Sequence, residues 1–444
     1  MTDPKSLKDS IGLRLVLIGL LIFVLLIPSA FINSLVHERA GRRSEAINEI
    51  TSKWSRRQTI GGPVVTIPYL QTWRDDKGET KSATKYIQLL PETLEISGEI
   101  RPEIRYRGIY KAIVYNAQLD VAGVFSFDKV RTMNIDADRL LWDKAFISVN
   151  ISDMRGINQY VELKWGDEAV LFEPGIKQGN DLFTSGVSVN LPSIPADAAG
   201  RIDYALHLDF KGSQALNFLP LGKTTMVNLK SAWSNPSFDG AFLPKRYQID
   251  SEGFSAAWQV LDLNRNYPQI WVDTETKDAV VLASAFGVNL FSPVDIYTQT
   301  TRAAKYMIMF VSLTFLVFFL AEVFSGRKIH PIQYLLVGGA LCIFYLLLLS
   351  LSEHINFSLA YVLASASVVI LIGTYVRGAL GKRTIPLFTA GMLAFLYAFL
   401  YILLQNQDYA LLLGSVGLFL ILAAVMYLTR KLDWYQIDLN NNRE

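Results

Sequence analysis

Hydrophobic and polar residues follow two different patterns along this chain. Nearly unbroken apolar runs occupy residues 11–32 and 306–428, whereas residues 33–302 alternate between short apolar and polar runs. The long runs are typical of helices that cross a membrane, because about 20 apolar residues are needed to span a hydrocarbon core about 30 Å thick. The short runs, separated by Gly, Pro, Asn and Asp, are typical of β-strands. We therefore predict a membrane protein of the α+β class.

Six segments are long and apolar enough to span a bilayer. We interpret the first as a retained anchor, since Pro28 stands where signal-peptide cleavage favours a small residue and the run is longer than a signal core. The other five predict a C-terminal five-helix transmembrane bundle. The six segments are Leu15–Ile32, Tyr306–Phe324, Ile332–Leu351, Phe357–Val376, Ile385–Leu404 and Tyr409–Leu428.

Lysine and arginine residues in the short loops predict the orientation, because they are in excess on the cytoplasmic side. The loops at 352–356 and 405–408 contain neither residue. The charge of every short loop agrees with an orientation in which both termini are cytoplasmic and residues 33–302 lie outside. The basic residues within 33–302 do not contradict it, because long translocated domains largely do not follow the rule. The basic residues that define the cytoplasmic side are Lys5, Lys8, Arg14, Arg327, Lys328, Arg377, Lys382, Arg383, Arg430 and Lys431.

The alternating region predicts a large antiparallel β-sandwich-type domain, preceded by a charged helical stalk at about 35–57. One large sandwich and two smaller ones both fit the pattern. The predicted strands are Pro63–Pro68, Lys85–Leu90, Ala117–Phe127, Ala145–Ile151, Tyr160–Trp165, Ala169–Glu173, Gly186–Leu191, Tyr204–Phe210, Thr224–Ser231, Phe254–Gln259 and Val280–Phe291. The predicted parts of the chain are a tail with its anchor (1–32), the β-rich domain (33–302), the bundle (303–429) and a second tail (430–444).

Composition narrows the functional classes. The net charge is +2, so no nucleic-acid partner is expected. Cys342 is the single cysteine, which excludes an intrachain disulfide, and the four histidines are dispersed. The sequence contains no phosphate-binding loop, nucleophile elbow, zinc-protease helix or Cys-x-x-Cys pair. We therefore expect no enzyme activity, catalytic residues, cofactor or bound metal.

Two sets of residues are candidates for function. The first lies where the predicted β domain meets the bundle, at Arg302, Lys305, Glu353 and His354. Glu353 and His354 form either a polar hairpin at the membrane surface or a conformational or proton-linked site. Because the helices at 306–324 and 332–351 are expected to be antiparallel neighbours, Glu353 is predicted to pair with Arg302 or Lys305.

The second set lies in the turn-rich segment 233–246, which contains Trp233, Phe238, Lys245 and Arg246. This segment is either a loop that binds another molecule or a long crossover of the sandwich.

Several stretches resemble the CreD family of bacterial inner-membrane proteins. They are GGPVVTIPY (61–69), NPSFDGAFLPKR (235–246), RAAKYMIMFVSLTFLVFFLAE (302–322), HPIQYLLVGGALCIFYLLLLSLSEHINF (330–357) and RKLDWY (430–435). The resemblance implies a Gram-negative envelope protein linked to the CreBC two-component regulon, envelope integrity, tolerance of certain colicins and the response to β-lactams. It implies no enzyme activity and supplies no catalytic residues.

The leading hypothesis is a non-enzymatic inner-membrane protein whose periplasmic β domain contacts an envelope component, either a protein, a glycan or a lipid. A second hypothesis is a transporter or lipid-handling protein that works through the helix bundle. A third is an envelope enzyme, which requires a cleft with converging carboxylates or His207. A polar cavity in the bundle favours the second hypothesis, whereas a closed apolar bundle opposes it.

Overall fold

The computed structural model describes residues 11–133, 135–192, 200–272, 278–290, 296–325, 329–380, 384–406 and 409–430. The chain divides into two units. One comprises Met1–Ser44 and Val294–Glu444, and the other comprises Glu45–Pro293. Apolar helices build the first unit and β-strands build the second, so the expected α+β class of membrane protein is confirmed.

Helix α2 (Ile11–Trp54) contains both the predicted anchor and the predicted stalk in one continuous helix of 44 residues. The remaining helices of the helical unit follow the β-strands in sequence. Among the described residues, six helices are long and apolar enough to cross a membrane, namely α2 and α6–α10. The helices after the β-strands are α5 (Ile296–Lys305), α6 (Met307–Ser325), α7 (Pro331–Ser352), α8 (Phe357–Leu380), α9 (Thr384–Gln405) and α10 (Ala410–Thr429).

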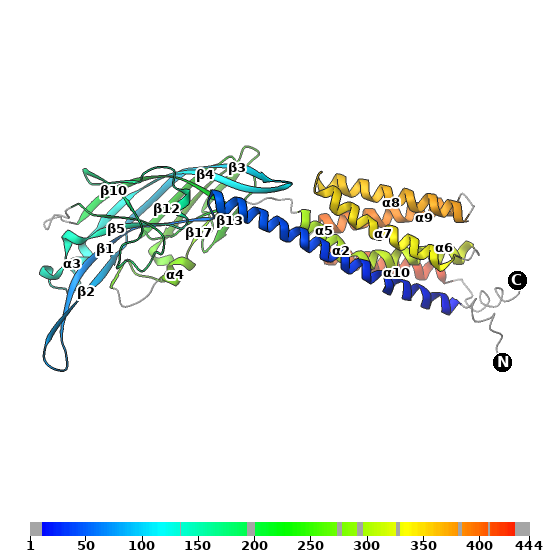
Figure 1. Cartoon of the computed structure of the whole chain (residues 1–444), viewed down its shortest axis with the longest axis horizontal. Coiled ribbons are helices and arrows are strands. Elements are labelled where there is room, and N and C mark those ends of the chain that lie inside the picture. The colour runs from blue at the N-terminus through cyan, green and yellow to red at the C-terminus, as the bar shows by residue number, and fades with distance from the viewer. Residues whose placement is uncertain are drawn as a thin grey trace. The chain divides into compact units, whose positions relative to one another are not determined.

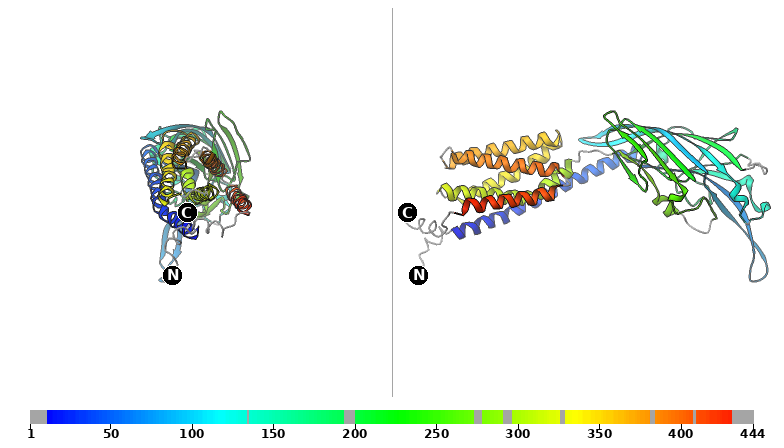
Figure 2. Two further views of the ribbon diagram at one scale, coloured as in Figure 1. Left: turned by 90° about the vertical axis from the view of Figure 1, so that its right-hand side faces the viewer. Right: turned by 180° about the vertical axis from the view of Figure 1, so that it is seen from behind.

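The helices from α6 onward run side by side and are coloured yellow to red in Figure 2. Aromatic rings fill the centre of this bundle. The ring of Phe344 lies 4.7 Å from that of Tyr397 and 5.5 Å from that of Tyr361, and Phe310 lies 4.5 Å from Tyr397. The Tyr361 hydroxyl donates to the carbonyl of Tyr397 at 2.7 Å, which joins α8 to α9.

The β unit consists of two sheets packed face to face, visible as two layers in Figure 1. The first sheet has the order β13-β17-β11-β1-β5-β9-β8, with β2 beside β1 and β16 beside β2. Its strands are β1 (Gln58–Arg74), β2 (Thr80–Leu89), β5 (Phe146–Ile151), β8 (Glu173–Pro174), β9 (Gly186–Asn190), β11 (Ala215–Phe218), β13 (Pro236–Gly240), β16 (Ile270–Val272) and β17 (Phe286–Leu290).

The second sheet has the order β14-β15-β12-β3-β4-β10-β6-β7. Its strands are β3 (Thr93–Arg107), β4 (Tyr110–Ser126), β6 (Glu162–Trp165), β7 (Glu168–Leu171), β10 (Arg201–Ser213), β12 (Thr224–Ser231), β14 (Arg246–Ile249) and β15 (Phe254–Leu261). The inner faces of both sheets contribute to one hydrophobic core, so the unit is a single sandwich. Most pairings are antiparallel as expected, but β1 pairs with β11 and β3 pairs with β12 in parallel.

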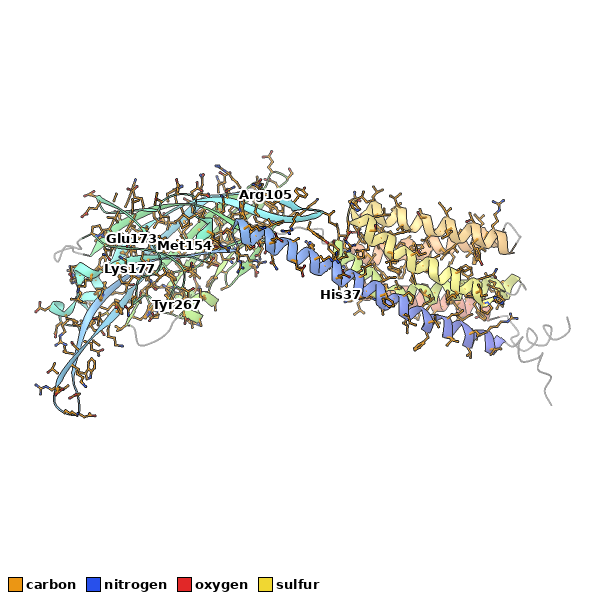
Figure 3. The ribbon with its side chains drawn as sticks, viewed as in Figure 1. His37, Arg105, Met154, Glu173, Lys177 and Tyr267 are labelled. Atoms are coloured by element: carbon orange, nitrogen blue, oxygen red, sulfur yellow. The ribbon has the colours of Figure 1, made fainter. Side chains whose placement is uncertain are left out.

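The outer faces of the two sheets differ. Strand β1 is buried along nearly all of Gln58–Tyr69, and the short turns η1 (Ala137–Arg139) and η2 (Trp142–Lys144) pack against it. Tyr267, labelled in Figure 3, anchors the chain that follows β15 by bonding to the carbonyl of Pro220 and to Ser284, each at 3.0 Å. The second sheet alternates regularly between buried and exposed residues, so its polar outer face remains accessible to solvent.

Some strand predictions were wrong for identifiable reasons. Residues 280–283, predicted as strand, belong to helix α4 (Asp278–Ala283). Strand β3 was missed because Gly98 and Pro102 interrupt its pattern. Strand β12 pairs with β3 only as far as Ile100, so Pro102 lies where β3 has no partner on that side and its missing N–H is harmless.

Candidate functional site

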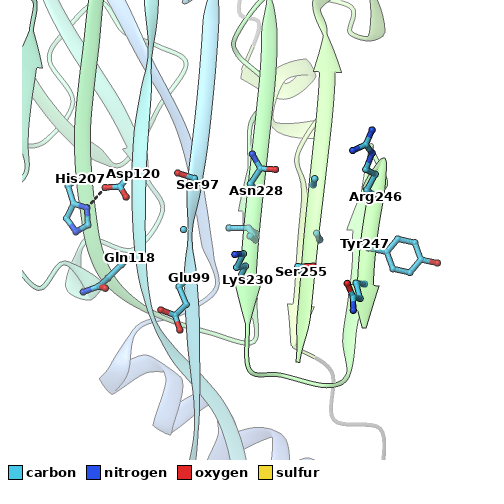
Figure 4. A pocket seen from close by; sticks show the side chains of 15 residues that line it. Ser97, Glu99, Gln118, Asp120, His207, Asn228, Lys230, Arg246, Tyr247 and Ser255 are labelled. Atoms are coloured by element: carbon cyan, nitrogen blue, oxygen red, sulfur yellow. Dashed lines mark hydrogen bonds and ion pairs between the residues drawn. The ribbon is translucent and has the colours of Figure 1, made fainter. Parts of the chain in front are cut away.

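A polar groove of about 780 Å³ lies on the outer face of the second sheet (Figure 4). It crosses six neighbouring strands, β10, β4, β3, β12, β15 and β14. The strand registers align its side chains in two rows, because residues paired across neighbouring strands point to the same face. One row contains His207, Asp120, Ser97, Asn228, Ala257 and Arg246, and the next contains Gln118, Glu99, Lys230, Ser255 and Gln248.

The half of the groove on β10, β4 and β3 is internally paired. His207 Nδ1 lies 2.7 Å from Asp120 Oδ1, and Gln118 donates to Asp209 at 3.0 Å. Arg101 donates to Glu99 at 2.8 Å and holds the pKa of that carboxyl below its usual range. Both carboxylates that line this half, Glu99 and Asp120, therefore already have protein partners.

The other half of the groove, on β12, β15 and β14, has polar groups that bond to no other described residue. Within the described parts of the chain, the side chains of Asn228, Lys230, Arg246 and Gln248 form no hydrogen bond or ion pair. These side chains are exposed. The groove is thus divided into a paired acidic half and an unpaired basic half.

The groove does not have the arrangement of a hydrolase triad. Across the sheet the order is His207, Asp120 and Ser97, so the carboxylate lies between the imidazole and the hydroxyl. Catalysis by a triad requires the imidazole in the middle, where it removes the proton of the nucleophile. Among the described residues, no group of three or more His, Cys, Asp or Glu side chains is placed to hold a metal ion.

The structure separates the four residues predicted in segment 233–246. Arg246 lines the groove, whereas Phe238 packs against the core, 5.6 Å from the buried ring of Trp258 and 5.4 Å from the exposed ring of Tyr247. Trp233 is half-buried against the core and donates to the carbonyl of Asn235 at 3.0 Å. Lys245 is exposed and donates to Gln259 at 2.9 Å. The segment runs from β13 of the first sheet to the start of β14 in the second sheet at Arg246, which agrees with the crossover alternative and not with a binding loop.

The structure also gives Glu353 partners other than those predicted. Tyr297 donates to Glu353 at 2.9 Å, and the Arg39 guanidinium lies 3.8 Å from the same carboxylate. The predicted ion pair with Arg302 or Lys305 is absent from the described contacts, since Arg302 points to the carbonyl of Leu404 at 3.5 Å. Lys305 and His354 are exposed. Sequence analysis did not identify Tyr297 and Arg39 as partners of Glu353, because neither residue lies in the segments that flank Glu353.

A second polar cluster lies at the other end of the helical unit. Arg14 donates to Glu322 at 2.8 Å, and Tyr334 donates to the other carboxylate oxygen at 3.1 Å. Glu322 is only 6% exposed. A charge at such a site is costly unless it is paired and hydrogen-bonded, which explains why three helices each supply one member of this cluster.

Helices α6, α9 and α10 enclose an apolar cavity of about 290 Å³. Leucine, phenylalanine and valine side chains such as Leu316, Phe395 and Val425 line it. The described residues that line the cavity offer no polar side chain to bind a hydrophilic solute, so the cavity does not resemble the substrate site of a transporter for polar molecules.

Comparison with a solved structure adds no functional argument. A mutant M1 zinc metallopeptidase from Deinococcus radiodurans, bound to a tyrosine-serine-alanine substrate, aligns with 45% of this chain and 42% of its own. The TM-score is 0.20 and the sequence identity is 10%. At this TM-score, the likeness carries no argument about fold or chemistry.

Sequence comparison confirms the family resemblance. The family described as inner membrane protein CreD matches residues 10–435. Inner membrane protein CreD of Escherichia coli strain K12 is 34% identical over 428 residues, which cover 94% of this chain and 92% of the relative. The match includes the helical unit and the β unit together. The chain therefore belongs to the CreD family of inner membrane proteins.

Proposed function

We propose that this protein supports cell-envelope integrity and the envelope-stress response by binding an envelope component through the polar groove, without catalysis. In this proposal both termini are cytoplasmic, the β unit is periplasmic and the helical unit holds it at the membrane. The observation that carries the proposal is the set of accessible polar side chains in the basic half of the groove, which have no partner among the residues that the structure describes. Unpaired polar groups gathered in a concave site are available to bind a ligand.

The chemistry of Glu99 and His207 in the groove favours ligand binding over catalysis. The charged partner of Glu99 lowers the pKa of its carboxyl, whereas a general acid needs a raised pKa. The imidazole of His207 is exposed and faces a carboxylate, with no nucleophile on its other side among the groove residues described.

The test fills the groove without changing its charges. Ala257 is half-buried on the outer face of β15, at the floor of the groove. A Trp at this position occupies the space above Ser255 and Asn228. In a strain that lacks the native gene, Ala257→Trp is expected to reduce complementation of detergent sensitivity and colicin response at unchanged protein level.

Ala205→Trp is the matched control, because Ala205 is also half-buried on the outer face of the same sheet but does not line the groove. The control is expected to complement like the wild type. Full complementation by Ala257→Trp would refute a role for the groove, whereas equal loss in both variants would point to a general defect of the sheet.

A further inference from the structure

The basic half of the groove has a defined geometry. Asn228 and Lys230 on β12 face Arg246 and Gln248 on β14, and the short side chains of Ser255 and Ala257 on β15 lie between them. We call this arrangement the cradle. Strands are about 4.8 Å apart and residues on one face are about 6.8 Å apart along a strand. The four corners therefore frame an area of about 10 Å by 7 Å with a low floor.

The four corner groups have complementary chemistry. Lys230 and Arg246 are cations on diagonal corners, and both side chains are long enough to converge over the floor. Asn228 and Gln248 are amides, which donate and accept hydrogen bonds simultaneously, and Ser255 adds a hydroxyl. Amides and hydroxyls are suited to sugar hydroxyl groups, while the two cations are suited to a carboxylate or phosphate.

Other classes of ligand fit the cradle less well. Protein interfaces usually bury aromatic or aliphatic anchors at their centre, but the centre of the cradle is a serine and an alanine. The ring of Tyr247, which lines the groove, packs against Phe238 at 5.4 Å and is directed away from the floor in Figure 4. A lipid chain would need an apolar slot, which the polar groups around the cradle do not provide.

The neighbouring carboxylates set the orientation of a bound anion. Glu99 lies directly across from Lys230 in the register of β3 with β12, and Asp120 lies one strand further away. Arg101 and His207 already pair with these carboxylates. An anionic group is therefore favoured over β15, between Lys230 and Arg246, and is repelled from the acidic half of the groove.

We propose that the cradle binds an anionic sugar unit of an envelope glycan, with its acidic group between Lys230 and Arg246 and its hydroxyls on Asn228, Gln248 and Ser255. This inference rests on the proposed function and names the class of ligand. The groove continues across β3, β4 and β10, so neutral neighbouring sugars of the same chain extend over Ser97 and Gln118.

The experiment uses the full chain in lipid nanodiscs and measures binding by saturation-transfer NMR. The probes are a tetrasaccharide with one terminal glucuronate on three N-acetylglucosamine units, a neutral N-acetylglucosamine tetramer, and inorganic phosphate. The charged tetrasaccharide is expected to bind at least tenfold more tightly than the neutral one. Ala257→Trp and Lys230→Met are each expected to weaken its binding at least tenfold.

The controls are Ala205→Trp and Lys164→Met, which lie on the same outer face outside the groove. They are expected to bind like the wild type. Equal binding of both tetrasaccharides would overturn the anionic assignment, and binding of phosphate as tight as that of the charged sugar would reduce the cradle to a simple anion site. Absence of binding for every probe would overturn the inference.

The outcomes separate this inference from the proposed function. If Ala257→Trp abolishes complementation but no sugar binds, the groove serves the envelope through another ligand and the inference is wrong. If the charged sugar binds and Ala257→Trp still complements fully, the cradle is a glycan site and the proposed function is wrong. Cleavage of the tetrasaccharide during the measurement would contradict the non-catalytic part of the proposal.

Discussion

Glu322 and Glu353 are both carboxylates near the ends of apolar helices, yet their surroundings differ. The Glu322 side chain is 7% exposed, and its partner Arg14 is 2.8 Å away. The Glu353 side chain is 10% exposed, but its nearest cation, Arg39, is 3.8 Å away and 37% exposed. The shorter and more buried pair should matter more for stability, because a desolvated charge without its partner is costly.

At the residue scale, we predict that Arg14→Leu destabilises the helical unit by about 3 kcal/mol, because it removes the cation that lies 2.8 Å from the buried carboxylate of Glu322. The double variant Arg14→Leu with Glu322→Leu is expected to regain most of this loss, since both charges are removed together. Thermal unfolding of the full chain in detergent, followed by the helical circular dichroism signal, measures both effects.

The control is Arg42→Leu, which breaks the ion pair of Arg42 with Glu38, where the two side chains are 58% and 53% exposed. Exposed pairs of this kind contribute at most about 1 kcal/mol. If Arg14→Leu destabilises the protein no more than Arg42→Leu does, then the ion pair of Arg14 with Glu322 makes no special contribution to stability.

At the scale of elements, two adjacent glycines of α7 have different environments. A Cβ on Gly338 would lie 2.3 Å from Leu25 of α2 and 3.1 Å from Phe315 of α6, whereas a Cβ on Gly339 would meet nothing within 4 Å. Small residues at such positions let membrane helices approach closely. Gly338 therefore brings three helices together, and Gly339 does not.

We predict that Gly338→Val destabilises the helical unit by about 1–3 kcal/mol, because its methyl groups push α7 away from α2 and α6. Gly339→Val is the matched control: it carries the same change in helix propensity but has free space around it. Melting temperatures of the two variants in detergent provide the comparison. Equal melting temperatures would show that close packing at Gly338 contributes nothing.

At the scale of the whole molecule, two clusters of the helical unit that each contain an arginine, a glutamate and a tyrosine lie at two levels. Arg14 with Glu322 and Tyr334 forms one level, and Arg39 with Glu353 and Tyr297 forms the other. Arg14 and Arg39 are about 37 Å apart along α2 at a rise of about 1.5 Å per residue. A hydrocarbon core about 30 Å thick fits between them. The two levels therefore match the two surfaces of a bilayer.

We predict that reporter fusions at 200, 328, 354, 380 and 406 read outside, inside, outside, inside and outside. The physical reason is the excess of Lys and Arg in one set of short loops. Paired alkaline phosphatase and green fluorescent protein fusions give opposite signals on the two sides. A fusion at 380 that is active outside would invert the orientation of α8 and α9 and contradict the model of both termini inside.

The sequence by itself determined the membrane helices, the class of the fold and most of the longer strands. A membrane helix satisfies its own backbone hydrogen bonds and is defined by a local run of apolar residues, so α6–α10 were predictable without knowing any neighbour. Strand β12 was predicted with its correct bounds because its residues alternate between core and solvent. The stretches quoted for the family resemblance were also sufficient to identify the family.

Only the tertiary structure decided which side chains meet. Tyr297 and Glu353 are 56 positions apart, and Arg14 and Glu322 are 308 positions apart, so no local pattern connects them. The groove depends on the pairing order and register of six strands, including the parallel pair of β3 with β12. Alternation along β12 shows that Lys230 points outward, whereas β14, which carries Arg246, was not predicted. Only the strand order brings the two side chains to opposite sides of β15, because register is set by pairing across the sheet and not by the sequence of one strand.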